Sequence, residues 1–487
     1  MPGVVISTSV RTGPSTATVR ESSQLFIVGK TERGPSDKAV LVESLSDFED
    51  IFGGFLTSSY THPTVETFFE EGGTRAFIAR AVGASATVGT LTLTTATPAD
   101  VITFTANGAG AWSADVDIAV THPTATTFKV DIYYLDVLKY TTGSVTTASQ
   151  AVGRINLSAI AARYVTAAVA AGGTALIPQV TAATALGTGD DNNDTVTSSE
   201  YIAQLALFND ALGSGAVVCP EDSGDTVSEA LIDHANLTSR IAILFGTEGA
   251  TATAMKEKAL SLQTGEGSEH AALYHPWVLV PTSVPGVGRF IPPVGYVAAK
   301  RAVAHNGTGP HLPAAGVVSA AKFVTGLKTD ISKVVGDDLD EGYVNAIRVI
   351  QNTVRVYGAR SLSSDNDNFR YITQQDVVNS IVTECYRSLE DVVFSSIDGR
   401  NTIFADIESR LVSILSVMRN LGALYPAFDA NGRELDNGYV VKCDSSINPT
   451  SQLANGLVKA RVGVRVSSIG DRIEIDIVKS NLTSTVV

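Results

Sequence analysis

An aspartate and a histidine stand in contexts that resemble the motifs of a hydrolytic site. Asp222 opens an Asp-Ser-Gly sequence directly after an apolar segment, and His305 opens a His-Asn-Gly-Thr sequence. A serine hydrolase also needs a nucleophilic serine that converges with such a pair. No Gly-Thr-Ser-Met-like helix start follows His305, and the similar residues 245–255 carry Glu248 at the key position in the wrong chain order. We interpret both side chains as turn formers and expect the histidines at the surface or in loops.

The cysteines and one acidic cluster could in principle bind a metal. Cys219, Cys385 and Cys443 are odd in number and lack a CxxC spacing, which indicates buried thiols rather than disulfides or a zinc site. The acidic cluster lacks the twelve-residue calcium loop with its closing glutamate, so we expect a solvated loop at Asp190, Asp191 and Asp194.

Two glycine pairs were considered as phosphate-binding loops. Gly53-Gly54 and Gly72-Gly73 lack the spacing of the GxxxxGK[ST] and GxGxxG motifs, so we interpret them as turns. The sequence therefore predicts no enzymatic activity, no metal and no cofactor.

Composition limits the partners and the location of the chain. Among 487 residues, 44% are hydrophobic and 17% charged, which is ample for buried cores in several domains. The net charge of −15 argues against nucleic acid as a direct partner. The first residues lack the apolar core of a signal peptide, and no apolar run approaches the length of a membrane span. We expect a protein that is made in the cytoplasm and has no direct membrane contact.

Residues 21–86 and 195–335 alternate between strand and helix patterns. This alternation predicts a largely parallel sheet with helices on both faces. Expected strands cover 25–29, 39–43, 76–82, 216–220, 240–245 and 272–280, and expected helices cover 46–52, 65–72, 198–212, 226–237 and 251–263. Residues 292–313 hold a short helix with Lys300 and Arg301, and 330–342 are expected to be an acidic connector.

Residues 87–194 have a different character. They are rich in threonine and alternate cleanly between apolar and polar side chains, as in 116–120 and 128–134. We expect an inserted, outward-facing antiparallel β domain, interrupted by a helix around 159–171.

Both ends of the chain favour extended structure. The arm of residues 1–20 is either a frayed end or a strand added to a sheet edge on another molecule, and its β-favouring residues are Gly3, Val4, Val5, Ile6 and Ser7. Strands are expected at 438–444, 456–467 and 471–479, the last two as a hairpin, followed by an arm at 480–487. The residues assigned to this C-terminal sheet and arm are Val462, Val464, Ile473, Ile475, Ile477, Leu482 and Val486.

Residues 336–479 follow a fixed order of elements. We expect a helix at 343–350, a strand at 353–357, a polar turn at 363–368 and an extended segment at 369–372. Two amphipathic helices follow, one at 374–394 with Thr373 as its N-cap and Asp376 three residues on, and one starting at 401 or 402 and ending near 421. Their apolar stripes predict an antiparallel pair that lies on a sheet.

The order of these elements resembles the C-terminal domain of contractile tail sheath proteins of bacteriophages (myovirus type) and phage-tail-like particles. The motif that carries the resemblance is aromatic-Gly-Ala-Arg-Ser-Leu, here Tyr357, Gly358, Ala359, Arg360, Ser361 and Leu362, followed by the FRYIT strand at 369–373 and a helix ending near Gly-Ala-Leu. Two departures are Tyr357 in place of the usual Trp, and Gln374 and Gln375 where basic residues are common.

The resemblance implies a subtilisin-like α/β core with an inserted antiparallel β domain, an α+β C-terminal sheath domain and extended terminal arms. It implies a virion-tail sheath that is assembled in the host bacterial cytoplasm, stacks as six-fold rings around an inner tube and contracts. Implied partners are further copies of the chain, the tail tube protein, and the baseplate and tail terminator proteins.

Four arginines of the C-terminal domain were considered as tube-facing: Arg348, Arg355, Arg360 and Arg370. Surface solvation or an internal ion pair is the alternative for each. Two alternatives for the whole chain also stay open, another self-assembling shell protein and, less favoured, a subtilisin-like hydrolase.

Overall fold

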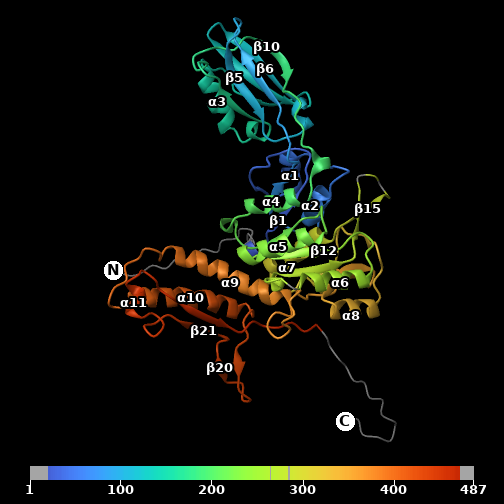
Figure 1. The fold of residues 1–487 in the computed structure, drawn as a ribbon, viewed down its shortest axis with the longest axis vertical. Coiled ribbons are helices and arrows are strands. Elements are labelled where there is room, and N and C mark those ends of the chain that lie inside the picture. Colours follow the sequence, from blue (N-terminus) through green and yellow to red (C-terminus); the bar gives the residue numbers. More distant parts are fainter. Residues whose placement is uncertain (1–19, 264, 283, 285, 472–487) are drawn as a thin grey trace, which may run out of the picture.

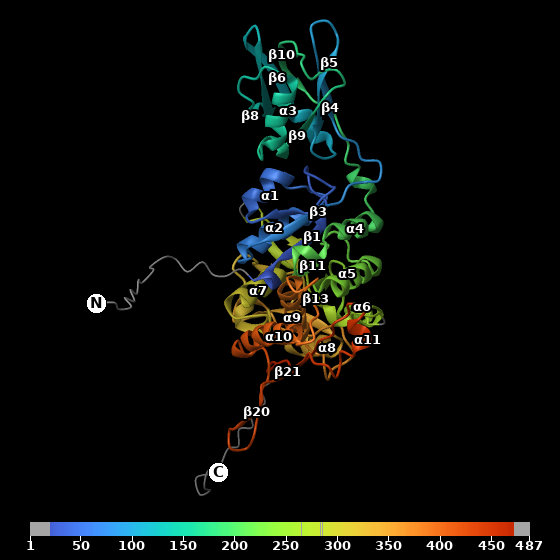
Figure 2. The same ribbon diagram turned by 90° about the vertical axis from the view of Figure 1, so that its left-hand side faces the viewer.

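The structure is a computed structural model, and it describes residues 20–471 except 264, 283 and 285. The molecule is elongated along one axis. A β domain lies at one end, an α/β sheet in the middle, and a helix pair with a small β-ribbon at the other end (Figures 1 and 2). The predicted residues of the N-terminal arm, together with Ile473, Ile475, Ile477, Leu482 and Val486, lie outside the described residues.

An eight-stranded sheet forms the centre of the molecule, in the order β18-β17-β13-β12-β11-β1-β3-β2. The six inner strands are parallel, and β2 and β18 pair antiparallel at the two edges. The strands are β1 (Leu25–Gly29), β2 (Val40–Val42), β3 (Ala76–Arg80), β11 (Ala216–Val218), β12 (Ile241–Phe245), β13 (Ala271–His275), β17 (Val344–Ile350) and β18 (Thr353–Val356). The predicted parallel sheet is confirmed.

Helices cover both faces of this sheet because the inner strands are apolar on both sides. Leu25 and Ile27 face a core formed with α1 (Leu45–Phe52), α2 (Thr61–Glu70) and α7 (Val294–Gly307). Phe26 and Val28 face a second core, formed with α4 (Ser198–Gln204), α5 (Asp225–Thr238), α6 (Ala252–Leu262) and α8 (Lys333–Glu341). A small sheet of β14 (Val278–Pro281), β15 (Gly288–Ile291) and β16 (Gly326–Leu327) extends the first side.

The β domain at one end has its own apolar core. One of its sheets contains β4 (Thr90–Thr94), β5 (Asp100–Ala106) and β9 (Val165–Val169), and the other contains β6 (Val116–Thr124), β7 (Thr127–Tyr134), β8 (Val137–Thr141) and β10 (Thr181–Ala185). All their pairings are antiparallel, as expected. The helix expected at 159–171 is wrong. The α-helix of this part is α3 (Ala148–Leu157), which ends before residue 159, and 159–171 contains edge strand β9, in which Val165 and Ala167 are buried at alternate positions.

The opposite end contains α9 (Ile372–Glu390) and α10 (Thr402–Asn420). The first turns of α9 contact the last turns of α10, and the end of α9 contacts the start of α10, so the predicted antiparallel pair is confirmed. A ribbon of β21 (Tyr439–Lys442) and β22 (Arg461–Val464) packs on the pair, with α11 (Thr450–Leu453) between its strands. A hairpin of β19 (Ala427–Phe428) and β20 (Glu434–Asp436) projects beyond the ribbon (Figures 1 and 2).

Three further expectations for the last third of the chain are wrong. Residues 344–350 form strand β17 rather than a helix, because Val344 and Ile347 are buried in the cores on opposite faces of the sheet, which continues through β18. Residues 333–341 are helix α8 rather than a connector, since Ser332 caps the helix and Leu339 fills a core position. Helix α9 starts before Thr373, with Gln374 Oε1 accepting from the Tyr371 N–H at 2.9 Å.

Ribbon strand β22 pairs with β21, and the residues expected to form a hairpin with it, 471–479, lie almost wholly outside the described part. Every helix in the described part of the chain is too short or too polar to span a membrane.

Candidate functional site

The two side chains considered for catalysis do not meet. The Asp222 carboxylate accepts from Ser198 Oγ at 2.6 Å and from the Gly224 N–H at 2.7 Å, at the start of α5. His305 lies on α7, and its ring contacts Asp376 instead. Its expected surface position is wrong, because His305 is 1% exposed. The described residues therefore hold this histidine in a closed interior contact rather than at a cleft with Asp222.

The cysteines and acidic residues have structural surroundings. Cys219 and Cys443 are buried and Cys385 is half-buried, and all three are free thiols. Burial raises the pKa of the Cys219 thiol far above its usual value, which keeps it protonated and unreactive. No cluster of histidine, cysteine or carboxylate side chains suited to a metal ion occurs in the described ranges.

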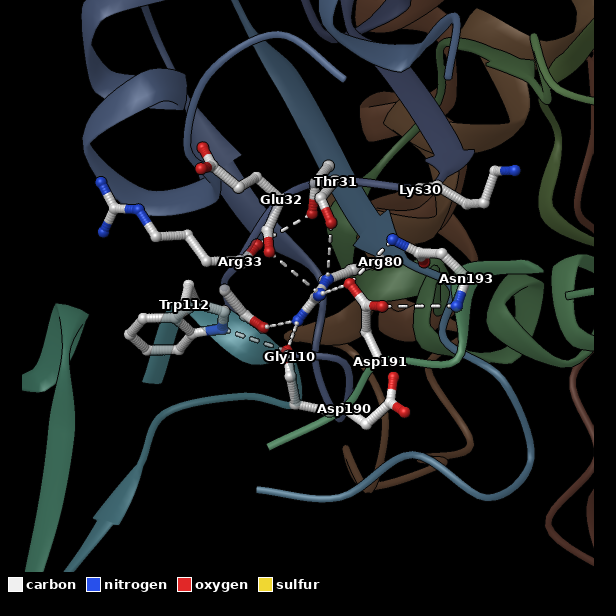
Figure 3. Close-up of polar contacts among 12 residues, drawn as sticks. Lys30, Thr31, Glu32, Arg33, Arg80, Gly110, Trp112, Asp190, Asp191 and Asn193 are labelled. Atoms are coloured by element: carbon white, nitrogen blue, oxygen red, sulfur yellow. Dashed lines mark hydrogen bonds and ion pairs between the residues drawn. The ribbon is translucent and has the colours of Figure 1, made fainter. Parts of the chain in front are cut away.

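We call the connection between the β domain and the sheet the neck. Arg80, at the end of β3, lies at its centre (Figure 3). The fully buried guanidinium donates to the backbone oxygens of Gly34 at 2.9 Å, Ala109 at 2.8 Å and Thr31 at 3.2 Å. Its Nη2 also pairs with the Asp191 carboxylate at 3.2 Å. One side chain therefore binds the loop after β1 at Thr31 and Gly34, the β domain at Ala109, and, at Asp191, the segment that leads from the β domain back to the sheet.

The charge of Arg80 and the close backbone approach at Gly108 agree with this role. Burial lowers the pKa of Arg80 to about 10 while Asp191 opposes the shift, so the side chain stays cationic at neutral pH. A Cβ atom at Gly108 would lie 2.0 Å from the Gly34 oxygen, so the close approach requires glycine. The expectation of a solvated acidic loop is wrong for Asp191, which is the buried cation's partner.

The segment that carries the family motif connects the sheet to α9. Tyr357 is 55% exposed, whereas Leu362 is buried and its N–H donates to the Ala271 oxygen at 2.9 Å. A Cβ at Gly358 would lie 2.7 Å from Asn345 Oδ1, whose carboxamide accepts from the Arg360 N–H at 2.7 Å. Ala359 and Ser361 are buried as well. The motif thus contacts β17 through Gly358 and Arg360 and β13 through Leu362, at the point where the chain leaves the sheet.

The four candidate tube-facing arginines have different surroundings. Arg360 is buried, pairs with Asp340 at 3.8 Å and lies over the Tyr343 ring, an internal arrangement. Arg370 pairs with Asp471 at 3.6 Å, and Arg348 donates to the Ile331 oxygen at 3.1 Å. Arg355 is half-buried on β18. Whether any of them contacts a tube stays a prediction.

A seam joins helix α9 to the core, and we define it by Gln375, Asp376 and Asn379 of α9 with His270, Arg301 and His305. Arg301 forms an ion pair with Asp376 and also donates to the Ser22 oxygen. Burial alone would raise the pKa of Asp376, but the Arg301 cation and His305 bring it below its usual value. A cavity of about 10 Å³ beside these residues holds at most one water, so the seam admits no substrate.

The root of the N-terminal arm is anchored at this seam. The Arg20 N–H donates to Asn306 Oδ1 at 2.9 Å, and Glu21 pairs with Arg387 of α9. Residues 20 and 21, the first that the structure describes, therefore lie between α7 and α9.

The ribbon presents open strand edges. Within the described part of the chain its sheet contains only β21 and β22, so each strand keeps one edge without a strand partner. Val462 and Val464 pack on the helix pair, whereas Val440 is 64% exposed. A groove of about 640 Å³ runs beside it, lined by Phe369, Val378, Tyr439, Val440 and Val464 among others. Such an edge can accept an added strand.

Comparison with solved structures shows the same fold along almost the whole chain. The sheath of an extracellular contractile injection system, PVC, in its contracted state is 15% identical, covers 99% of this chain and 98% of its own, and has a TM-score of 0.57. The sheath tail protein of Listeria innocua is 15% identical over 87% of this chain and 89% of its own, with a TM-score of 0.60. The contracted helical sheath of the anti-feeding prophage is 14% identical over 99% of both chains, with a TM-score of 0.57.

The chain has the fold of a contractile sheath protein. The resemblance inferred from residues 357–362 is thereby confirmed at the level of the fold. No family model matches the sequence, and no curated protein matches it either.

Sequence reasoning missed the buried charges of this sheath fold. Arg80 stands in the apolar strand AFIAR, and Lys300 and Arg301 stand in the apolar helix VGYVAAKRAVAHNG. Charged residues within apolar runs are seldom buried unless they are paired, so these positions did carry a signal. The partners Asp191, Glu71 and Asp376 are far away in the sequence, and periodicity could not have named them.

Proposed function

We propose that this chain is the structural subunit of a contractile tail sheath. Copies stack as six-fold rings around an inner tail tube, and their contraction drives the tube through a bacterial envelope for genome or effector delivery. The observation that supports this most is the likeness to the PVC sheath over 99% of this chain and 98% of its own. Its proposed partners are other copies of itself, the tube protein, and the baseplate and terminator proteins, and its proposed place is the tail.

The proposed assembly uses strand exchange. Residues 3–7 and the C-terminal arm of residues 480–487 add as strands to the ribbon edges of neighbouring copies, so that main-chain hydrogen bonds tether subunits while their rigid bodies move. The open edges of β21 and β22, and the exit of the chain at Arg20 beside α9, support this route. We propose the corresponding division into a subtilisin-like core, an outer β domain, a tube-proximal C-terminal domain and two arms. In this division β17 and β18 belong with the core sheet.

A contractile lattice of this kind needs no nucleotide, because the extended form is metastable and shortening buries more contact between subunits. We propose no catalytic role. The separation of Asp222 from His305 disfavours the hydrolase alternative. Another shell protein would not be expected to share a fold with contracted sheaths over the full chain.

Negative-stain electron microscopy of the purified protein tests the proposal, beside a version that lacks residues 1–20. We expect hollow striated tubes from the full chain and small particles from the truncated one. Monodisperse monomers from both would contradict sheath assembly. Tubes from both would keep the assembly and remove strand donation by the N-terminal arm.

A further inference from the structure

The contact between α9 and the core is unusually polar for a buried contact. After Ile372 at its first position, α9 meets the core through Gln375, Asp376 and Asn379, which are 4%, 1% and 3% exposed. The helix pair and its ribbon have separate apolar clusters around Val377 with Leu415 and around Phe404 with Leu411. The pair could therefore leave the core as a unit without breaking these clusters.

One half of the seam is built around His305. Its Nε2 lies 3.5 Å from Asp376 Oδ2, while its Nδ1 is buried and has no hydrogen-bond partner. Protonation would place a second N–H at Nδ1, and the nearby acceptors, Asp376 and the Ser22 carbonyl, already bind the Arg301 cation. A buried donor without an acceptor is strongly unfavourable.

The other half of the seam is built around His270. Its Nδ1 lies 3.0 Å from the Arg240 backbone oxygen and must donate to it, so Nε2 is left to accept from Gln375 Nε2 at 2.9 Å. The same amide nitrogen donates to Asn379 Oδ1 at 2.9 Å. Protonation of His270 at Nε2 would set a donor against the Gln375 N–H, and turning the carboxamide to present Oε1 would break its bond to Asn379. Both halves therefore fit a neutral imidazole and reject an imidazolium.

We propose that this seam is an acid-sensitive latch, which holds the helix pair on the core while His270 and His305 are neutral and releases the pair as a unit when both are protonated. Release of α9 would also break the ion pair between Arg387 of α9 and Glu21 at the root of the arm. The inference concerns the single chain and does not depend on the proposed function.

The surrounding charges give the direction of the effect. Facing His305 are Arg301 of its own helix, Asp376 of α9 and the Ser22 carbonyl, and facing His270 are the Arg240 carbonyl, Gln375, Asn379, Glu269 and Asp376. Burial lowers the pKa of both histidines, with the Arg301 cation adding to the shift at His305. The released state therefore binds protons more readily, so docking weakens as pH falls below about 6.5. The pKa of Asp376 is itself lowered, so its loss of charge belongs to a more acidic range.

Hydrogen exchange followed by mass spectrometry on the full chain tests the latch at pH 7.5 and 5.0, with labelling times corrected for the intrinsic rate. We expect residues 372–381 to exchange at least about tenfold faster at pH 5.0. A histidine that stays neutral in the docked state weakens docking about tenfold for each pH unit below its pKa in the released state. Residues 241–245 of β12 should keep their protection. The double variant H270Q/H305Q should show the same exchange at both pH values, and H122Q, in the outer β domain, should respond as the unmodified chain does.

Three results would overturn the latch. They are no acid response at 372–381 in the unmodified chain, equal loss of protection in β12, and an undiminished response in the double variant. If the double variant does not fold, the single variants decide, because each should respond less than the unmodified chain. Tube formation is a separate readout, so failure of the latch would leave the proposed function untouched.

Discussion

Buried ion pairs hold the three parts of the molecule together at a few individual side chains. Arg80 fixes the neck, and Arg301 fixes α9. Glu71 pairs with Lys300 at 2.6 Å, and its carboxylate also accepts from the N–H groups of 322–324. Breaking such a pair leaves a charge buried without compensation, so each residue is more sensitive than its contact area suggests.

The substitution R80M should show this sensitivity. We expect it to lower the free energy of unfolding by about 3–5 kcal/mol, because it leaves the Asp191 carboxylate without its cation and four backbone oxygens without their donor. Urea denaturation measures the loss. The matched control K333M removes an exposed pair with Asp337 and should change stability by less than about 0.5 kcal/mol. Equal effects of R80M and the control would contradict the role of the neck.

At the scale of elements, the sequence predicted the strands and helices that depend on local apolar periodicity. The parallel strands, helices α5 and α6 and the α9–α10 pair follow from apolar periodicity and were expected. Residues 344–350 were misassigned because VNAIRVI fits either period, and its pairing with β13 decides for a strand. The partners of Arg80 and His305 depend on tertiary contacts that one sequence does not reveal.

The open ribbon edge predicts an assembly defect without a folding defect. In V440E a charge replaces an exposed apolar side chain on β21. We expect the free energy of unfolding of the monomer to change by less than about 0.5 kcal/mol, since the site is exposed, while tube formation is lost. L237E, at an 80% exposed position on α5, is the control and should leave assembly intact. Sedimentation and negative-stain microscopy would measure both, and normal tubes from V440E would remove this edge from the interface.

At the scale of the whole molecule, the outer β domain has its own core and is joined to the sheet through the contacts of Arg80. Its two chain ends meet where the Thr87 N–H donates to the Asp190 oxygen at 2.6 Å. It lies at the end of the molecule opposite the ribbon (Figures 1 and 2). In the proposed sheath this arrangement places it away from the surface where arms are exchanged.

Residues 87–190, expressed alone, should therefore fold. We expect a single cooperative thermal transition and a circular dichroism spectrum dominated by β structure, because the fragment retains its apolar core. The absence of a cooperative transition would show that the domain depends on the neck for its fold.

A helical reconstruction by cryo-electron microscopy of tubes formed by the full chain tests the central claim most directly. The account predicts six-fold rings in which residues 3–7 of one copy pair with the β21–β22 ribbon of a neighbour. Tubes of another symmetry, or tubes in which every ribbon edge is occupied by its own chain, would contradict assembly by strand exchange.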